Sequence, residues 1–237
     1  MSLSLHDFQK QSFLALKIPD AYTFDSFYSG ANKGIVLSLK NGIDSNRPNQ
    51  FMICGDEGSG KSHILTALYN YTNLNSENVL FLDFNVLKNL PCEIINIEPP
   101  KLALFDNIHA VAGNLDWENA IFAFYNRYID SRQGIFVATS NVSVDKIKYI
   151  RKDLNTRLLN GITFKIAPLD EEGCAQALVL KAQSRGMSLS KQVAIFLVNN
   201  FNKDMKNLVK ILDTLDDYQL QAQRTLSIPF VKKVLNL

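Results

Sequence analysis

A short glycine-rich segment holds the residues with the most direct chemical meaning in this sequence. Residues 55–62 read GDEGSGKS and fit the pattern G-x-x-x-x-G-K-[ST], whose backbone N–H groups surround nucleotide phosphates. In this pattern Lys61 reaches the outer phosphates, and the Ser62 hydroxyl coordinates magnesium. The residues expected at a site for ADP or ATP are Gly55, Gly58, Ser59, Gly60, Lys61, Ser62 and the adjacent His63.

The segments on either side of this loop have the character that phosphate binding requires. A glycine-rich loop holds phosphate where a helix N-terminus points its partial positive charge at the anion. Residues 50–54 form a short apolar run that stops at Gly55, which predicts a strand. Ile64, Leu65 and Leu68 recur at helical spacing, which predicts a helix after Ser62. This context favours a phosphate loop over a plain glycine turn.

A second strand supplies an acidic residue for the same site. Residues 102–106 read LALFD, and a continuous apolar run of this kind suits a strand buried on both faces. Asp106 falls at its carboxyl end, where open α/β sheets bind ligands, so we expect Asp106 and Ser62 to hold magnesium together. Many P-loop ATPases place a second acid at the next position to orient the attacking water, whereas this chain has Asn107, whose amide cannot act as a carboxylate base. The sequence therefore predicts secure nucleotide binding and slow hydrolysis.

The pattern along the chain predicts an α/β fold followed by a helical part. Three more strands are expected at residues 79–83, 134–139 and 162–166, alternating with helices around residues 117–129 and 154–159, which indicates a largely parallel sheet. After Pro168 only helical periodicity remains. We expect an extended tail over residues 1–18, a nucleotide-binding α/β domain over 19–167 and a helical domain over 168–237.

Composition excludes several classes of protein. The 237 residues are 46% hydrophobic and 20% charged, and no apolar run approaches the roughly 20 residues needed to span a bilayer. The three cysteines and three histidines are scattered without metal-ligand spacing, which fits a cytoplasmic protein and argues against a zinc site. The formal net charge of +2 gives no strongly basic footprint for nucleic acid.

The order of these parts resembles the AAA+ proteins of the bacterial replication-initiator group, DnaA, and more closely the Hda family of small DnaA homologues. The segments that carry the resemblance are YTFDSF at 22–27, LFDNI at 104–108, AGNLDWE at 112–118, AIFAFYNR at 120–127 and AQRTLSIPFVK at 222–232. The resemblance extends from about Gln11 to the last residue. It implies a AAA+ P-loop module with a parallel sheet flanked by helices, followed by a small all-helical lid. It includes no counterpart of the helix-turn-helix domain of an initiator.

The resemblance also assigns residues to nucleotide sensing. Asn141 stands at a polar strand end where initiators often carry aspartate, and Lys206 stands in the lid where the family usually carries an arginine. An ammonium replaces a planar guanidinium there, so the phosphate contact becomes a point charge. The adenine would be enclosed near Ile18, Tyr22 and Phe24 and by the lid around Lys206. These departures favour a regulator stabilised by its nucleotide over a fast ATPase.

The amino-terminal segment resembles the sliding-clamp-binding motif of Hda-type proteins. In QSFLAL at 11–16, Gln11 would bond at the rim of a hydrophobic cleft on the clamp, while Leu14 and Leu16 fill apolar pockets. Ser12 and Ala15 depart from the residues common at their positions in the family. Without the resemblance, the same segment reads as a tail with chance leucines.

One arginine resembles the finger that AAA+ proteins insert into a neighbour's site. Arg157 precedes the last expected strand, and in trans its planar guanidinium would stabilise charge on the transferring γ-phosphoryl group. Its plain interpretation is a solvated charge at a helix end. The basic stretch Lys146, Lys148, Arg151 and Lys152 fits a solvated face, and Arg151 is the substitute candidate for the finger.

Three functions follow from these features. The resemblance implies a nucleotide-bound regulator that binds the DNA-loaded sliding clamp, the beta subunit of DNA polymerase III, and stimulates ATP hydrolysis by the initiator DnaA, which prevents re-initiation. The alternatives are an autonomous AAA+ ATPase, such as a helicase loader, and a DNA-binding accessory factor. A homodimer is possible, and no membrane partner is expected. The protein would contact DNA mainly through the loaded clamp.

Overall fold

A parallel sheet forms the centre of the larger part of the molecule. The computed structural model describes residues 22–45, 49–72, 78–132, 134–201, 203–222 and 226–237. Its five strands, in the spatial order β2-β3-β4-β1-β5, pair in parallel throughout. They are β1 (Asn49–Cys54), β2 (Val79–Asp83), β3 (Leu102–Asp106), β4 (Ile135–Ser140) and β5 (Ile162–Lys165). Each lies within one residue of the strand predicted from its apolar run.

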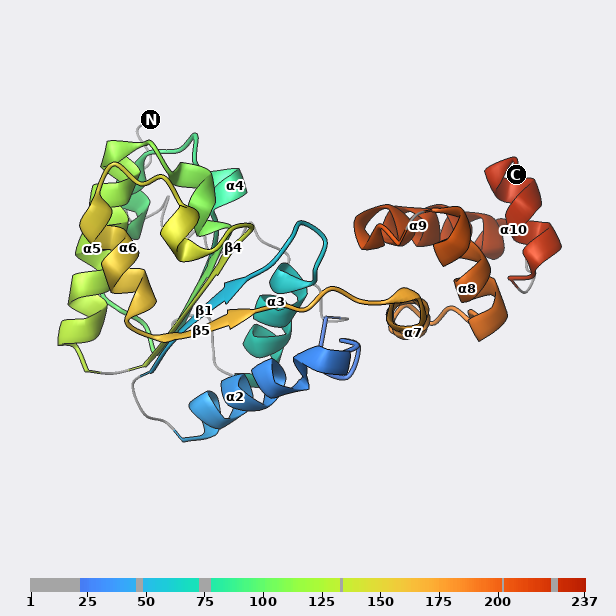
Figure 1. Ribbon diagram of the computed structural model, residues 1–237, viewed down its shortest axis with the longest axis horizontal. Coiled ribbons are helices and arrows are strands. Elements are labelled where there is room, and N and C mark those ends of the chain that lie inside the picture. Colours follow the sequence, from blue (N-terminus) through green and yellow to red (C-terminus); the bar gives the residue numbers. More distant parts are fainter. Residues whose placement is uncertain (1–21, 46–48, 73–77, 133, 202, 223–225) are drawn as a thin grey trace, which may run out of the picture.

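Helices cover both faces of this sheet (Figure 1). On one face lie α2 (Lys33–Asp44) and α3 (Lys61–Thr72), and on the other lie α5 (Leu115–Asp130) and α6 (Lys152–Leu159). The short helix α4 (Phe84–Leu87) follows β2 directly. Crossover helices are what parallel strands require, and they explain why β1, β3 and β4 are buried almost throughout.

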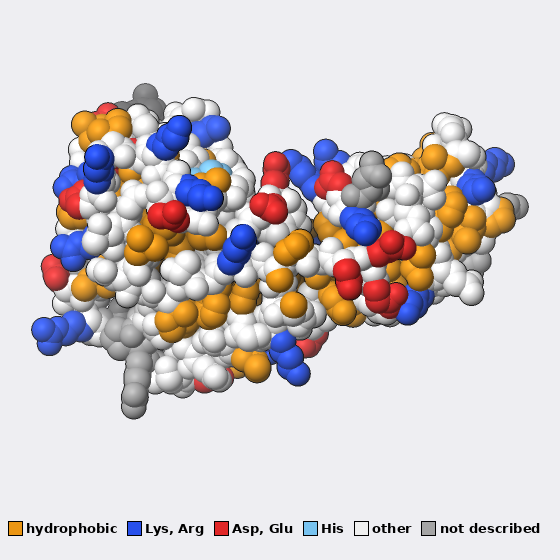
Figure 2. Space-filling view, viewed as in Figure 1, with side chains coloured by type: hydrophobic (Ala, Val, Ile, Leu, Met, Phe, Trp, Pro, Cys, Tyr) orange, Lys and Arg blue, Asp and Glu red, His pale blue; other side chains and the backbone are white. Residues whose placement is uncertain are grey.

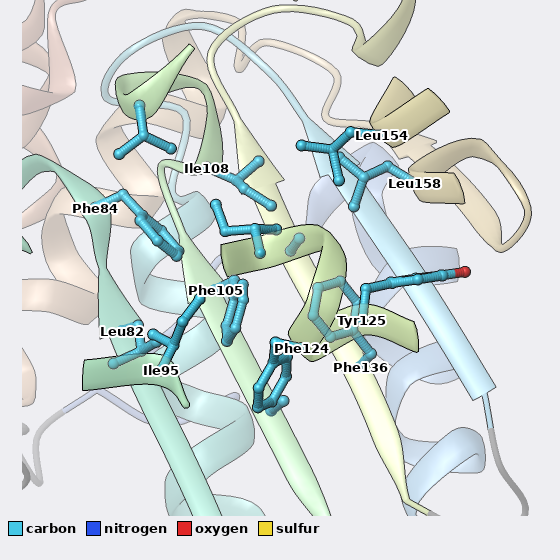
Figure 3. Close-up of a cluster of buried hydrophobic side chains, with 14 of the residues drawn as sticks. Leu82, Phe84, Ile95, Phe105, Ile108, Phe124, Tyr125, Phe136, Leu154 and Leu158 are labelled. Atoms are coloured by element: carbon cyan, nitrogen blue, oxygen red, sulfur yellow. The ribbon is translucent and has the colours of Figure 1, made fainter. Parts of the chain in front are cut away.

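Aromatic side chains fill the core between the sheet and α5 (Figure 3). The Phe105 ring contacts those of Phe124 and Phe136 at centroid distances of 5.1 and 5.0 Å. Trp117 packs edge-on against Phe84 at 5.5 Å. The α5 residues Trp117 and Phe124 thus belong to the core. Phe122 differs, because its ring is only half buried at the rim of the same cluster.

The carboxyl ends of the strands meet at one edge of the sheet. Asp106 at the end of β3 is opposite Asp83 at the end of β2, and Cys54 at the end of β1 is opposite Ser140 at the end of β4. Since Gly55 directly follows β1, the glycine-rich loop begins at this edge. The register therefore places Asp83, Asp106 and the loop on the same side of the sheet, where open α/β folds bind ligands.

The remainder of the described chain is the predicted helical lid, drawn in orange and red in Figure 1. It comprises α7 (Glu171–Gln183), α8 (Lys191–Asn200), α9 (Met205–Ala222) and α10 (Ile228–Leu235). Leu178, Leu197 and Leu212 are fully buried in a core separate from those of the sheet. Asp170 begins α7, because its carboxylate accepts a hydrogen bond from the Gly173 N–H at 2.7 Å. The predicted α/β module with a following all-helical lid is confirmed.

The surface carries a mixture of charges. Positive and negative side chains are interspersed over the face shown in Figure 2, in keeping with the formal net charge of +2. Across the described residues, no helix combines the length and the apolar character needed to cross a membrane.

Candidate nucleotide-binding site

The glycine-rich loop borders a cavity of about 490 Å³ that also reaches the lid. Gly58 and Gly60 adopt φ angles of 78° and 95°, which favour glycine. A Cβ atom at Gly60 would lie 2.9 Å from the Phe27 ring, so this position has no room for a side chain. Backbone conformation therefore requires glycine at both positions, and close packing requires it at Gly60 as well.

Lys61 projects from the start of α3 beneath the loop. Its side chain is 4% exposed, and its Nζ donates hydrogen bonds to the carbonyl oxygens of Gly55 at 2.8 Å and Asp56 at 2.7 Å. Burial lowers the pKa of this ammonium, while the charge of Asp106 opposes that shift. The loop carbonyl oxygens thus hold a buried cation at the cavity, where its charge suits an anionic ligand.

Asp106 and Ser62 are brought together as the sequence predicts. The Asp106 side chain is 2% exposed and accepts hydrogen bonds from the hydroxyls of Ser62 and Thr139. Burial raises the pKa of this carboxyl, and the two hydroxyl contacts oppose that shift. A carboxylate and a hydroxyl in contact beside the phosphate loop fit magnesium, which takes few protein ligands and completes its shell with water and phosphate oxygens.

Asn107 is held in an unusual backbone conformation at the cavity wall. Its φ of 57° lies in the left-handed region, which asparagine tolerates better than most residues. Its Nδ2 donates to Asp83 Oδ1 at 3.0 Å, and the same oxygen accepts the Asn85 N–H at 3.0 Å. The carboxylate nearest to this amide is therefore engaged by two donors, and Asp83 is absent from the residues that line the cavity.

Both expected sensor residues line the cavity, from opposite sides. The Asn141 N–H donates to Nδ1 of His109 at 3.3 Å. Lys206, in the first turn of α9, forms an ion pair with Glu57 of the loop. This contact lowers the pKa of the Glu57 carboxyl and raises that of the Lys206 ammonium. Lys206 therefore lies over the loop, and its ammonium group is paired with the carboxylate of Glu57.

His63 connects the phosphate-loop helix to the segment before α2. Its Nε2 lies 3.0 Å from the Thr23 carbonyl oxygen and 3.2 Å from Ser26 Oγ. The rings of Tyr22 and Phe27 pack edge-on against the imidazole at 4.8 and 5.3 Å. Burial lowers the pKa of His63 to about 4, so the ring is neutral near pH 7. This places His63 at the cavity wall as a packing residue.

The sequence located only part of the wall opposite the loop. Tyr22 lines the cavity, whereas Phe24 does not, because its ring packs against Tyr71 at 5.8 Å and under Lys40. Ile18 lies outside the described residues. The wall residues that the sequence did not indicate are Ser26, Phe27, Tyr28, Asn32, Asn85, Leu169, Ala177, Lys181, Met205, Val209 and Lys210.

Arg157 lies at the opposite end of the sheet from the loop. Its carbonyl oxygen accepts hydrogen bonds from Tyr125 Oη at 2.9 Å and from Nε2 of Gln50, at the start of β1, at 3.1 Å. The strand from Gln50 to Gly55 spans roughly 16 Å at about 3.3 Å per residue. An arginine side chain does not bridge that separation. Arg157 therefore cannot reach a phosphate bound by its own loop.

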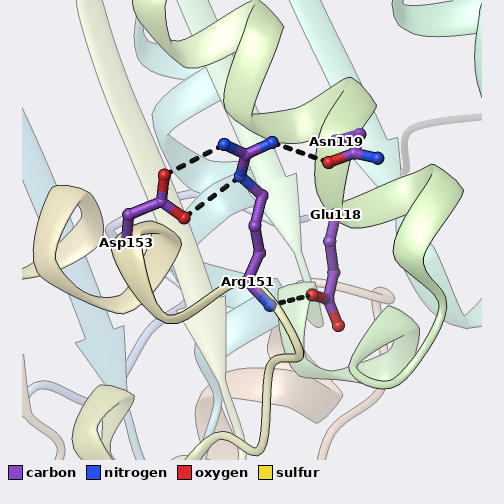
Figure 4. Close-up of polar contacts among 4 residues, drawn as sticks. All are labelled: Glu118, Asn119, Arg151 and Asp153. Atoms are coloured by element: carbon purple, nitrogen blue, oxygen red, sulfur yellow. Dashed lines mark hydrogen bonds and ion pairs between the residues drawn. The ribbon is translucent and has the colours of Figure 1, made fainter.

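The two candidate arginines differ in how they are engaged. Arg151 forms a bidentate pair with Asp153, with N···O distances of 3.1 and 3.0 Å, and donates to Asn119 Oδ1 at 2.7 Å (Figure 4). Its guanidinium also lies 4.0 Å from the centroid of the Phe122 ring. Arg157 is exposed, lies 5.8 Å from the same ring and donates no side-chain hydrogen bond to another described residue. We call Phe122, Arg151 and Arg157 the arginine face.

The expected clamp-binding residues Gln11, Leu14 and Leu16 lie outside the described residues. Their assignment stays a prediction.

The sheet order, the loop at the carboxyl end of β1, Asp106 at the end of β3 and the following helical lid define a P-loop protein of the AAA+ class. Family comparison narrows this class. The model of the bacterial DnaA ATPase domain matches residues 18–165, and that of the Hda lid domain matches residues 170–235. The chain belongs to the DnaA-like AAA+ proteins and has the lid of the Hda family.

One relative matches nearly the whole chain, and solved structures share its fold. An uncharacterized protein of Haemophilus influenzae is 36% identical over 230 residues, which cover 96% of this chain and 99% of the relative. Domain III of the replication initiation protein DnaA from Thermotoga maritima superimposes with a TM-score of 0.77 at 21% identity, covering 92% of this chain and 96% of that domain. AMPPCP-bound DnaA from Aquifex aeolicus gives a TM-score of 0.65 at 20% identity, covering 84% of this chain and 67% of that structure.

Proposed function

We propose that this protein is a nucleotide-bound regulator of replication initiation, which binds the DNA-loaded sliding clamp in the cytoplasm and stimulates ATP hydrolysis by the initiator DnaA. The observation that carries the proposal is the contrast between Asn107 and Arg157. The site at the loop has an amide at the position of the catalytic base, and the unengaged arginine lies out of reach of that site. Such a molecule is suited to hold its own nucleotide and act on another.

The resident ligand we propose is ADP or ATP with magnesium. The loop, the buried Lys61 and the pair formed by Ser62 and Asp106 provide the contacts for phosphates and metal. The DnaA of Aquifex aeolicus, which has the same fold, binds AMPPCP. Magnesium held by Ser62 and Asp106 would supply positive charge beside the outer phosphates, while Lys61 and the loop N–H groups fix their orientation.

Hydrolysis of this resident nucleotide should be slow. An amide neither removes a proton from water nor carries the charge that a general base needs. Asp83 is the carboxylate that contacts the Asn107 amide, and its Oδ1 already accepts hydrogen bonds from Asn107 and Asn85. This arrangement favours a regulator over an autonomous ATPase such as a helicase loader.

The proposed action in trans belongs to Arg157. A guanidinium inserted beside the γ-phosphate of a partner stabilises negative charge in the transition state, an effect worth about three to five powers of ten in rate. Arg157 is exposed and its backbone is fixed by Tyr125 and Gln50, so its side chain is presented from a rigid support. The lid match to the Hda family supports DnaA as the partner whose site is completed.

Clamp binding is proposed for the tail, through Gln11, Leu14 and Leu16. Deletion of residues 1–17 should abolish binding to the clamp and leave ADP binding intact, because the phosphate loop, Lys61, Ser62 and Asp106 all lie later in the chain. Gln11→Ala combined with Leu14→Ala should reproduce the deletion, since rim and apolar anchors dominate such short motifs. Retention of clamp affinity in calorimetry by the deletion variant would assign the contact elsewhere.

A reconstituted reaction tests the proposed function. ATP turnover is measured for this protein alone, for the initiator alone, and for the two mixed with and without a clamp loaded on DNA. We expect slow turnover from either protein alone and a marked increase only when the loaded clamp is present. Fast turnover by this protein without the initiator would establish the autonomous ATPase instead.

A further inference from the structure

A lysine of the lid is buried in the wall of the cavity without a hydrogen-bond acceptor. Lys181 of α7 is 6% exposed, and its Nζ has no hydrogen-bond partner among the described residues. Gln219 Oε1 is the other unpartnered polar atom of this kind in the described chain, but Gln219 does not line the cavity. A buried ammonium without acceptors is costly, so this position calls for a reason.

The neighbours of Lys181 do not meet this need. Its Nζ lies 2.9 Å from the centroid of the Tyr22 ring, a cation–π contact that supplies no lone pair to its N–H groups. Asp213, the nearest acidic group, already pairs with Arg185 at 2.7 Å. Burial and the charge of Arg185 lower the pKa of Lys181 to about 7. The ammonium is therefore surrounded by a ring face and a cation.

The surroundings of Lys181 suit a nucleobase better than a phosphate. The groups suited to bind phosphate at this cavity are the loop and Lys61. Lys206 also lies close to the loop, because a Cβ atom added at Gly58 would be 3.6 Å from the Lys206 Cβ. Lys181 lies instead against Tyr22, whose ring packs on His63. The same wall carries the aromatic and apolar side chains of Phe27, Tyr28, Leu169, Ala177, Met205 and Val209, beside the polar Ser26, Asn32, Asn85 and Lys210. A flat heterocycle with acceptor nitrogens is the ligand that such a wall accommodates.

We propose that Lys181 is the residue that recognises the purine base, by donating a hydrogen bond to a ring nitrogen. The inference rests on the proposed nucleotide site and identifies the residue that would recognise the base there. The bound base would satisfy the ammonium that the protein leaves without an acceptor. Because Lys181 belongs to the lid and Tyr22 to the sheet-bearing part, the same contact would fasten the lid over the bound nucleotide.

The test compares a nucleotide with a ligand that lacks the base. Lys181→Met keeps the length of the side chain and removes its charge and its donors. Binding of ADP and of inorganic tripolyphosphate is measured by competition against a fluorescent ADP analogue. We expect ADP affinity to fall roughly ten- to a hundredfold, the effect of losing a hydrogen bond to a charged donor, and tripolyphosphate affinity to stay unchanged. The unliganded melting temperature should hold or rise, because an unsatisfied buried charge is removed.

A matched control is Lys233→Met, which replaces an exposed lysine of α10, in the lid, that does not line the cavity. It should leave ADP affinity near that of the wild type. Unchanged ADP affinity in Lys181→Met would overturn the inference, and equal losses for ADP and tripolyphosphate would assign Lys181 to the phosphates. Failure of the nucleotide site itself is distinguishable, because the wild-type protein would then bind neither ligand.

Discussion

The phosphate loop and the arginine face hold their charges in opposite ways. At the loop, Lys61 and Asp106 are almost fully buried and each is hydrogen-bonded within the protein. At the arginine face, Arg157 is exposed and its guanidinium is not engaged by any described side chain except the distant ring of Phe122. Buried, prearranged groups suit the retention of a ligand, whereas an exposed cation on a rigid support suits contact with a partner.

The two arginines of that face sharpen the comparison. Arg151 shares the Phe122 ring with Arg157, but its planar fork is occupied by Asp153 and Asn119. An exposed ion pair contributes little to stability, although it does orient the side chain. Arg151 and Arg157 are thus chemically identical and close in sequence, but only Arg157 has side-chain donors that are not engaged by other described residues.

The largest effect is expected at Arg157. Arg157→Ala should remove stimulation of the initiator and leave folding, nucleotide binding and clamp binding intact, since the side chain makes no contact with the loop. Arg157→Lys should also fail, because a point charge does not reproduce the planar fork. Arg151→Ala is the matched variant and should retain stimulation in the same assay. The reverse result for the two alanine variants would make Arg151 the finger.

The next largest effect should come from the loop. Lys61→Ala should weaken binding of ADP and ATP by about a hundredfold, because a charge-assisted contact to phosphate is lost. Calorimetry gives the affinity, and Lys101→Ala, at an exposed lysine before β3, is the control. Binding of normal strength by Lys61→Ala would mean that the nucleotide is held elsewhere.

Acid should destabilise the protein through His63. Its folded-state pKa of about 4 lies below its ordinary value of 6.5, so its contribution to stability is complete above pH 6.5 and is lost as pH falls towards 4. The loss at the acid end amounts to at most about 3 kcal/mol. Urea unfolding of His63→Gln between these pH values should show a shallower decline than wild type. Parallel declines would show that another group titrates.

The smallest effect concerns the ion pair over the loop. Glu57→Gln should free Lys206 for a phosphate and raise ATP affinity about two- to fivefold, a modest change because both partners are exposed to solvent. The gain should vanish in the double variant with Lys206→Ala, and Glu98→Gln serves as the control for loss of an exposed carboxylate. A lower ATP affinity in Glu57→Gln would instead make Glu57 part of the binding site.

The strands and the loop could be predicted because their signals are local. Buried parallel strands read as continuous apolar runs, and the loop requires glycines at Gly58 and Gly60 for backbone reasons alone. Helix α2 was not predicted. Gly42 weakens its helical pattern, yet a Cβ at this position would lie 2.9 Å from the Phe51 ring, so packing against β1 explains the glycine.

The wall opposite the loop could not be predicted, because it depends on how the lid meets the segment before α2. Lys181 lies among apolar residues of α7. This position in the sequence indicates that the lysine is buried, but it does not indicate which residues the lysine contacts. Phe24 and Tyr22 are two residues apart and chemically similar, yet only Tyr22 reaches the cavity. The engagement of Arg151 likewise depends on Asn119, which is distant in sequence.

The central claim is that the nucleotide held by this protein is retained while that of the initiator is hydrolysed. Single-turnover reactions with ATP labelled at the γ-phosphate test this claim, with the label preloaded either on this protein or on the initiator before the two are mixed with the DNA-loaded clamp. We predict rapid release of labelled phosphate when the label starts on the initiator, and little release when it starts on this protein. Equal release from both preloaded proteins, or faster release from this one, would contradict the account.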